Sequence, residues 1–151
     1  LNADGGTRCA SITAAGIALR LAVRRLIASG TCLPLEQRPT FEQSRAGFIP
    51  AALTGDAATA HENAVMEHDI AAISVGLIDG STWLDLDYIL DSNADVDMNV
   101  IMTSDDRFVE IQGTGEEATY SRAENDALLN LAEKGLAELH ALQVSLLSDV
   151  N

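Results

Sequence analysis

Residues 70–88 of this 151-residue chain read IAAISVGLIDGSTWLDLDY. Two apolar runs, at residues 70–78 and 82–88, are joined by Asp79-Gly80, and an Asp-Gly pair between apolar runs is a strong signal for a β-hairpin. In the second run apolar and acidic residues alternate, so we expect the acidic side chains to share one face of a sheet. The stretch therefore predicts two paired antiparallel strands.

Two further strands are predicted downstream of this hairpin. Residues 98–103 and 107–112 lie on either side of the polar turn Ser104-Asp105-Asp106. Upstream, residues 8–29 carry apolar side chains near helical spacing, and Gly30 is a plausible C-terminal stop. These elements predict a helix followed by four strands.

A second helix is predicted at the C-terminal end of the chain. Ser121 and Glu124 form an S-x-x-E capping box, and the leucines that follow recur every three to five residues. The order of helix, four strands and helix predicts an α+β fold with a four-stranded sheet and a C-terminal helix. We expect one domain over residues 1–151.

The segment at about 31–68 does not fit this order of elements. It holds all three prolines of the chain and several glycines, with a short Ala-rich helix predicted near residues 57–66. It is longer than an ordinary connection between secondary-structure elements. We interpret it as an atypical insertion on the surface.

Composition indicates a globular protein, with 47% apolar and 21% charged residues. No apolar run is long enough to span a membrane and no secretory leader opens the sequence, so a cytoplasmic location is expected. Cys9 and Cys32 have no metal-ligand spacing, which favours structural, free thiols in a reducing compartment. The sequence begins at Leu1 rather than Met, so we expect a fragment or a processed product.

The charge of the chain is strongly negative and unevenly distributed. Nine Lys and Arg against 23 Asp and Glu give −14, which taken alone argues against nucleic-acid binding. Four arginines gather near the start of the chain: Arg8, Arg20, Arg24 and Arg25. Seven acids share a short stretch: Asp85, Asp87, Asp91, Asp95, Asp97, Asp105 and Asp106. Net charge therefore does not decide the partner.

Residues 4–8 place two glycines, a hydroxyl and a guanidinium where the first helix is expected to begin. Unpaired backbone N–H groups and the positive end of the helix dipole favour an anion at such a position. Gly6, Thr7 and Arg8 could thus hold a phosphate. The alternative is a tight turn and a helix cap, with Arg8 merely solvated.

The acidic turn at residues 91–97 resembles an EF-hand loop at first sight. That loop requires Gly at its sixth position and Glu at its twelfth, where this chain has Val96 and Met102, so an EF-hand calcium site is not expected. The alternatives are a solvated turn or carboxylates around Mg²⁺ and a reacting phosphate. In extended chain Asp91 and Asp97 would lie roughly 20 Å apart, so they can share an ion only if the chain between them folds back.

Several motifs, in the same order along the chain, resemble those of the C-terminal part of bacterial-type ribonuclease PH, a family of phosphorolytic 3′-5′ exoribonucleases. They lie at residues 3–8 (ADGGTR), 10–14 (ASITA), 71–76 (AAISVG), 84–88 (LDLDY), 91–92 (DS), 97–100 (DMNV), 107–114 (RFVEIQGT) and 130–135 (NLAEKG). Chiefly residues 31–69 fall outside this resemblance.

The resemblance implies phosphorolysis, in which inorganic phosphate attacks the last internucleotide bond of RNA and a nucleoside diphosphate is released. Gly6, Thr7 and Arg8 would bind the phosphate. Asp91 and Asp97 would be the catalytic and metal-binding aspartates, assisting through Mg²⁺ or through proton transfer. We expect Asp97 to be the more essential of the two.

The family also implies the partners: the 3′ ends of tRNA precursors and a homo-oligomeric, hexameric ring, with no membrane. Two departures from its pattern stand out. Leu90 replaces an acid of the family, and the family's N-terminal half, which supplies a further phosphate-binding arginine and most basic RNA contacts, is not in this sequence. The alternatives are therefore a catalytically silent ring subunit and an RNA-binding scaffold.

Overall fold

The computed structural model, which describes residues 4–116 and 118–150, contains a four-stranded antiparallel sheet in which the hairpin supplies one edge strand and the central strand beside it. The strands are β1 (Ile70–Ile78), β2 (Ser81–Leu84), β3 (Val96–Thr103) and β4 (Phe108–Gly115), in the spatial order β2-β1-β3-β4. Asp79 and Gly80 have φ values of 49° and 72°, the left-handed conformation that a two-residue type I′ turn requires. The predicted hairpin is confirmed.

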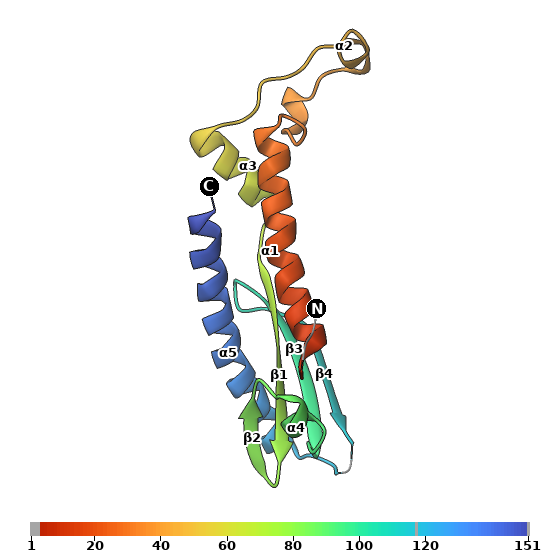
Figure 1. Cartoon of the computed structure of the whole chain (residues 1–151), viewed down its shortest axis with the longest axis vertical. Helices are drawn as coiled ribbons and strands as arrows, with labels where there is room; N and C mark the ends of the chain where they lie inside the picture. The colour runs from red at the N-terminus through yellow and green to blue at the C-terminus, as the bar shows by residue number, and fades with distance from the viewer. Residues whose placement is uncertain (1–3, 117, 151) are drawn as a thin grey trace. The chain divides into compact units, whose positions relative to one another are not determined.

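Two long helices accompany the sheet, α1 at the start of the chain and α5 at its end (Figure 1). The helices are α1 (Thr7–Ala28), the 3₁₀ turn η1 (Leu35–Gln37), α2 (Phe41–Arg45), α3 (Gly55–Val65), α4 (Tyr88–Asp91) and α5 (Arg122–Asp149). The predicted α+β class is confirmed. The chain divides into two compact units, residues 1–17 with 69–151 and residues 18–68, and α1 runs from the first into the second.

Helix α5 covers one face of the sheet. Its buried residues Leu128, Ala132 and Leu136 pack against alternate side chains of β1 and β3. Those side chains are Ala71, Ile73, Val75 and Leu77 on β1 and Val96, Met98, Val100 and Met102 on β3. Ser121 accepts from the Glu124 amide and the Glu124 carboxylate accepts from the Ser121 amide, so the predicted capping box is confirmed.

The first turns of α1 lie on the opposite face of the sheet. Cys9 is buried with Ala72 and Ile101, and the Thr13 hydroxyl donates to the Ala72 carbonyl and accepts from the Ala72 amide. Ala72, Ser74 and Gly76, in the middle of β1 on this face, are small, so the helix can approach the strand closely. This approach brings the loop before α1 to the middle of the sheet.

Strand β2 is shorter than predicted. It ends at Leu84 because Asp85 adopts a positive φ of 57° and donates its amide to the Ser74 carbonyl, 2.9 Å away. Leu86 is then buried, and Asp87 caps α4 by accepting from the Leu90 amide. The prediction that residues 82–88 form one strand with its acids on one face was therefore wrong after Leu84.

Strands β3 and β4 are longer than predicted, and β4 is exposed along its whole length. It forms an edge of the sheet, and the register of its pairing with β3 shifts between Ile101 and Met102. Apolar side chains stay exposed on two elements: Phe108, Val109 and Ile111 on β4, and Leu142, Val144 and Leu146 on α5. Within the described residues, none of the helices has the length and apolar character needed to cross a membrane.

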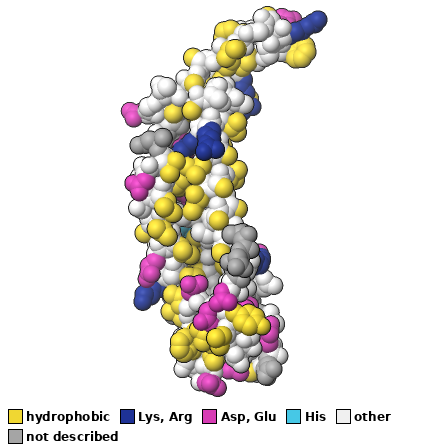
Figure 2. All heavy atoms as spheres, in the orientation of Figure 1, with side chains coloured by type: hydrophobic (Ala, Val, Ile, Leu, Met, Phe, Trp, Pro, Cys, Tyr) yellow, Lys and Arg dark blue, Asp and Glu magenta, His cyan; other side chains and the backbone are white. Residues whose placement is uncertain are grey.

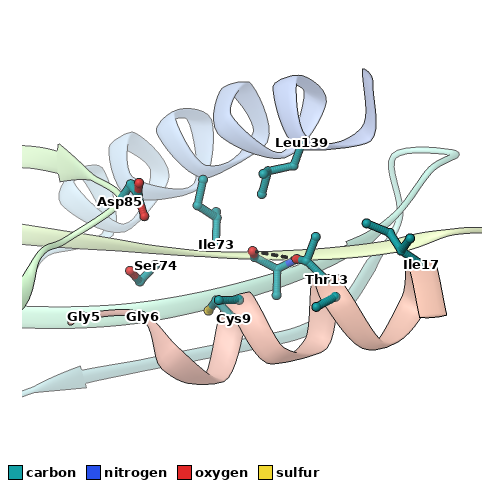
Figure 3. Close-up of a pocket in the computed structure, with 12 residues that line it drawn as sticks. Gly5, Gly6, Cys9, Thr13, Ile17, Ile73, Ser74, Asp85 and Leu139 are labelled. Atoms are coloured by element: carbon teal, nitrogen blue, oxygen red, sulfur yellow. Dashed lines mark hydrogen bonds between the residues drawn. The ribbon is translucent and has the colours of Figure 1, made fainter. Parts of the chain in front are cut away.

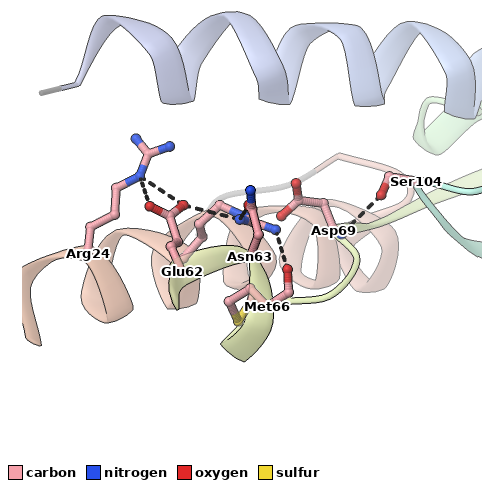
Figure 4. Close-up of polar contacts among 7 residues, drawn as sticks. Arg24, Glu62, Asn63, Met66, Asp69 and Ser104 are labelled. Atoms are coloured by element: carbon pink, nitrogen blue, oxygen red, sulfur yellow. Dashed lines mark hydrogen bonds and ion pairs between the residues drawn. The ribbon is translucent and has the colours of Figure 1, made fainter. Parts of the chain in front are cut away.

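The unit at residues 18–68 is held together by a buried ion pair. Arg20 of α1 donates to Glu62 of α3 at 3.1 Å, and Arg24 donates to the other oxygen of the same carboxylate at 2.8 Å (Figure 4). Arg20 also donates to the Met66 carbonyl at 2.9 Å, where α3 ends. A buried charge is tolerated only when it is paired in this way. The helix predicted near residues 57–66 is α3, which begins slightly earlier.

Candidate functional site

The loop at the start of α1 is packed against the chain that leads into α4. Gly6 has a φ of 60°, a left-handed conformation that favours glycine, and α1 begins at Thr7. At Gly5 there is no room for a side chain, because a Cβ atom would run into the carbonyl oxygen of Leu86 and lie 2.9 Å from the carbonyl carbon of Asp87. The two glycines therefore let the start of α1 pack against residues 86–87, which lead into α4.

The chain between Asp91 and Asp97 folds back, as an ion shared by their two carboxylates would require. Helix α4 and the turn after it return the chain to the sheet, where the Asp95 amide donates to the Leu77 carbonyl at 2.9 Å. Asp95 itself accepts from the Asp79 amide at 3.1 Å, so its carboxylate is engaged at the hairpin turn. Asp97 follows on β3, paired with Gly76 of β1.

One cavity of about 250 Å³ collects all the site residues predicted from the sequence. Its lining comprises Asp4, Gly5, Gly6, Thr7, Arg8, Ser74, Asp91, Asp97 and Asn99. The structure thus brings the start of α1 together with both aspartates, although more than 80 residues separate them in sequence. Their roles in phosphate binding, metal binding and catalysis remain predictions.

The electrostatic environment of Asp97 is unfavourable for an isolated carboxylate. Burial raises the pKa of Asp97, the charges of Asp91 and Glu116 raise it further, and a hydrogen bond from the Met98 amide opposes the rise. A cation beside these carboxylates would offset the repulsion from Asp91 and Glu116 and would favour the charged form of Asp97. Figure 2 shows acidic side chains gathered over the end of the sheet that carries α4.

The donor set of the cavity fits Mg²⁺. Asp91 and Asp97 supply two carboxylates, and Mg²⁺ is commonly held by one or two carboxylates together with water and substrate phosphates. Within residues 4–116 and 118–150 no group of three or more His, Cys, Asp or Glu side chains is arranged around a common metal position. Water and phosphate oxygens would therefore complete the coordination shell.

Arg8 lines the cavity but is already paired. One of its terminal nitrogens donates to the Glu110 carboxylate of β4 at 2.7 Å, and both side chains are close to half exposed. A guanidinium has five N–H donors, so this ion pair leaves donors for an anion. The pairing also orients the guanidinium relative to the sheet.

Sequence reasoning missed a short chain of hydrogen bonds behind Asp97. The Cys9 thiol donates to the Asn99 side-chain oxygen at 2.8 Å, and the Asn99 amide nitrogen donates to Asp97 at 3.3 Å. Burial raises the pKa of Cys9 to about 11, with nearby carboxylates adding to the rise and Arg8 opposing it, so the thiol stays protonated and able to donate. Asn99 lies on the strand predicted over residues 98–103, two residues after Asp97, so the alternation of side chains could have identified it had that strand been extended to Asp97.

A second cavity, of about 300 Å³, adjoins the first and shares Gly5, Gly6 and Ser74 with it (Figure 3). It extends between α1 and β1, where its lining is mostly apolar, with Ala14, Ile17 and further small or aliphatic side chains. The Ser74 hydroxyl, also missed by sequence reasoning, lies at the junction of the two cavities.

Comparison with known proteins defines the class of this chain. Residues 68–135 match the 3′ exoribonuclease family, domain 2, so the chain carries a domain of that family. The matched segment contains all four strands, Asp91 and Asp97, and it ends within α5.

The particular relatives are proteins named ribonuclease PH, which confirms the resemblance seen in the motifs. The chain is 46% identical over 147 residues to ribonuclease PH of Syntrophomonas wolfei, covering 97% of this chain and 49% of that protein. It is 48% identical over 143 residues to that of Rhodopirellula baltica, covering 95% and 48%. For that of Bacillus pumilus the identity is 43% over 151 residues, covering 99% and 50%.

The chain thus spans about half the length of the curated relatives it matches. The match to the Syntrophomonas wolfei protein covers 97% of this chain and therefore extends into residues 31–68. That these residues form an insertion relative to the family stays a prediction.

Proposed function

We propose that this chain is part of a phosphate-dependent 3′-5′ exoribonuclease that trims RNA 3′ ends, in particular those of tRNA precursors, and releases nucleoside diphosphates. The observation that carries the proposal is the single cavity in which Gly6, Thr7 and Arg8 meet Asp91 and Asp97. A helix N-terminus with a guanidinium suits a phosphate, and paired carboxylates suit a divalent cation.

In the proposed reaction an oxygen of inorganic phosphate attacks the phosphorus of the last internucleotide linkage. The bond from that phosphorus to the 3′ oxygen of the preceding nucleotide breaks, and the 3′ oxygen takes up a proton. The last nucleotide leaves as its diphosphate. The backbone and hydroxyl of Thr7 and the Arg8 guanidinium would hold and orient the attacking phosphate.

Asp91 and Asp97 act on the leaving side of this reaction. Mg²⁺ bound to them would stabilise negative charge on the phosphoryl and leaving oxygens. The raised pKa of Asp97 also suits it to hold a proton for the leaving 3′ oxygen when no cation is bound. Asn99 and Cys9 keep the Asp97 carboxylate oriented from behind.

The charges of the cavity give a physical reason for coupling metal and phosphate. Three aspartates, Asp4, Asp91 and Asp97, face one arginine, and that arginine is itself paired with Glu110. An anion entering this cavity meets net negative charge unless a cation enters as well. We therefore expect phosphate to bind more tightly when Mg²⁺ is present.

The test compares Asp97→Asn with Asp95→Asn in the assembled protein that contains this chain. The assay is the phosphate-dependent release of nucleoside diphosphates from RNA. Asp97→Asn should lower turnover about 100-fold or more with RNA affinity nearly kept, because a charge is removed at the reacting centre while shape is retained. Asp95→Asn should be close to silent, because its carboxylate is bound to the hairpin turn.

Equal losses in the two variants would mean that the turn acts only through its summed charge. Undiminished phosphorolysis in Asp97→Asn would end the catalytic assignment of this residue.

A second candidate, a silent ring subunit or an RNA-binding scaffold, is favoured by one observation. Arg8 is the one cation among the residues that line the described cavity, so a second phosphate-binding arginine would have to come from elsewhere. RNA binding without any phosphate-dependent release of diphosphates by the assembled protein would support this candidate and contradict the first.

We also propose a homo-oligomer, a hexameric ring, located in the cytoplasm. The exposed apolar side chains of α5 and β4 support an assembly, because a neighbouring subunit would remove them from water. Two free thiols are compatible with a reducing compartment. A strictly monomeric mass at micromolar concentration in light scattering would remove the ring.

A further inference from the structure

Ser74 carries a buried hydroxyl that nothing in the described chain pairs. The residue is 3% exposed, and its Oγ atom has no hydrogen-bond partner among residues 4–116 and 118–150. Its carbonyl accepts from the Asp85 amide, 2.9 Å away, and the residue lies opposite Asn99 in the sheet. The Ser74 hydroxyl is thus a buried side-chain group without a hydrogen-bond partner among the described residues.

The position of this hydroxyl points to the phosphate loop. A Cβ atom at Gly6 would lie 3.2 Å from Ser74 Oγ, so the hydroxyl sits directly beside the residue before α1 begins (Figure 3). Its neighbour across the sheet, Asn99, already uses its side chain toward Cys9 and Asp97. Among the described residues, none accepts the proton of the Ser74 hydroxyl.

We propose that Ser74 is a further phosphate-binding residue, whose hydroxyl donates a hydrogen bond to an oxygen of inorganic phosphate held at the Gly6–Arg8 loop. This inference rests on the proposed function and adds to it a residue from the sheet. A buried donor without an acceptor destabilises the free protein, and a phosphate oxygen removes that cost. A neutral donor also binds an anion without needing a countercharge in an acidic cavity.

The competing occupant is a water molecule in the adjoining cavity. A buried water needs two to four polar partners. The polar side chains of that cavity besides Ser74 are Cys9, Thr13 and Asp85, and those of Cys9 and Thr13 are already bonded to Asn99 and Ala72. A water beside Ser74 would therefore find only the Ser74 hydroxyl and the Asp85 carboxylate as further partners among the side chains that line this cavity.

The test is a titration of the assembled protein that contains this chain with inorganic phosphate in the presence of Mg²⁺. Amide NMR signals of residues 6–8 and calorimetry give the affinity for the wild type, Ser74→Ala and Thr13→Val. Ser74→Ala should weaken phosphate binding about tenfold or more, because hydrogen bonds to charged groups are strong. Its thermal unfolding midpoint without phosphate should be no lower than that of the wild type, since no native hydrogen bond is lost.

Thr13→Val is the matched control. The Thr13 hydroxyl lines the adjoining cavity but is paired with Ala72, so its removal should lower stability and leave phosphate affinity unchanged. A third arm titrates a short RNA without phosphate, for which Ser74→Ala should match the wild type. Ser74→Cys, which keeps the size of the side chain with a weaker donor, replaces Ser74→Ala should that variant not fold.

The outcomes separate this inference from the proposed function. If the wild type binds phosphate and the Ser74 variant binds it with the same affinity, the role of Ser74 is overturned while the proposed function stands. So would a variant that loses affinity for RNA but not for phosphate. Absence of saturable phosphate binding in the wild type would overturn both.

Discussion

Replacing Leu136 with alanine tests the packing of α5 on the sheet. Leu136 is 1% exposed and belongs to the core cluster formed with β1 and β3. A Leu→Ala change at such a site removes three buried carbon atoms and leaves a cavity that close-packed neighbours fill only in part. The cost is about 3 kcal/mol, from the lost transfer free energy and the cavity together.

The matched control is Leu142→Ala, which makes the same change on the same helix at a side chain that is 54% exposed. The two substitutions alter helix propensity equally, so the difference between them reports burial alone. The control should stay within about 0.5 kcal/mol of the wild type.

Urea unfolding followed by circular dichroism measures both variants. Leu136→Ala should lower the midpoint by roughly 1–2 M, with an unchanged slope. Equal shifts in the two variants would refute the packing described above, because they would mean that both faces of α5 are covered to the same degree.

Three further predictions concern the capping of α5 and the site. Ser121→Ala should lower the free energy of unfolding by about 1 kcal/mol in urea titrations, because it removes the cap of α5. Asp97→Asn should raise the thermal midpoint at neutral pH. The pKa of Asp97 is raised in the folded state above its unfolded value of 3.8. The folded wild type therefore loses stability as pH rises from 3.8 through the folded-state pKa, because Asp97 then ionises more readily in the unfolded chain. Below this range the carboxyl is protonated in both states, so the higher thermal midpoint of Asp97→Asn should vanish in acid. The wild type should lose stability relative to Cys9→Ala between pH 9 and 11, because its thiol ionises at about 9.0 when unfolded and about 11 when folded. A stability difference between the wild type and Asp97→Asn that does not change from acid to neutral pH would contradict the Asp97 prediction. A stability difference between the wild type and Cys9→Ala that does not change from pH 9 to 11 would contradict the Cys9 prediction.

Most secondary structure could be predicted from the sequence because its signals are local. The Asp-Gly turn, the capping box before α5 and the helical spacing of α1 each act within a few residues. The end of β2 could not be predicted in this way. Its alternating pattern continues past Leu84, but the hydrogen bond from Asp85 to Ser74 and the burial of Leu86 depend on β1 and on the loop before α1.

The candidate site, like the secondary structure, could be predicted from the sequence only in part. Sequence alone was enough to single out Gly6, Thr7, Arg8, Asp91 and Asp97, through the helix start, the acidic turn and the family motifs. Only the tertiary structure decided that they line one cavity, because the approach of two glycines to another backbone segment is invisible to spacing along the chain. The pairing of Arg8 with Glu110, 102 residues away, likewise exists only once β4 lies beside β3. The unpaired hydroxyl of Ser74 results from packing as well, since its burial in the sheet leaves it without a hydrogen-bond partner among the described residues.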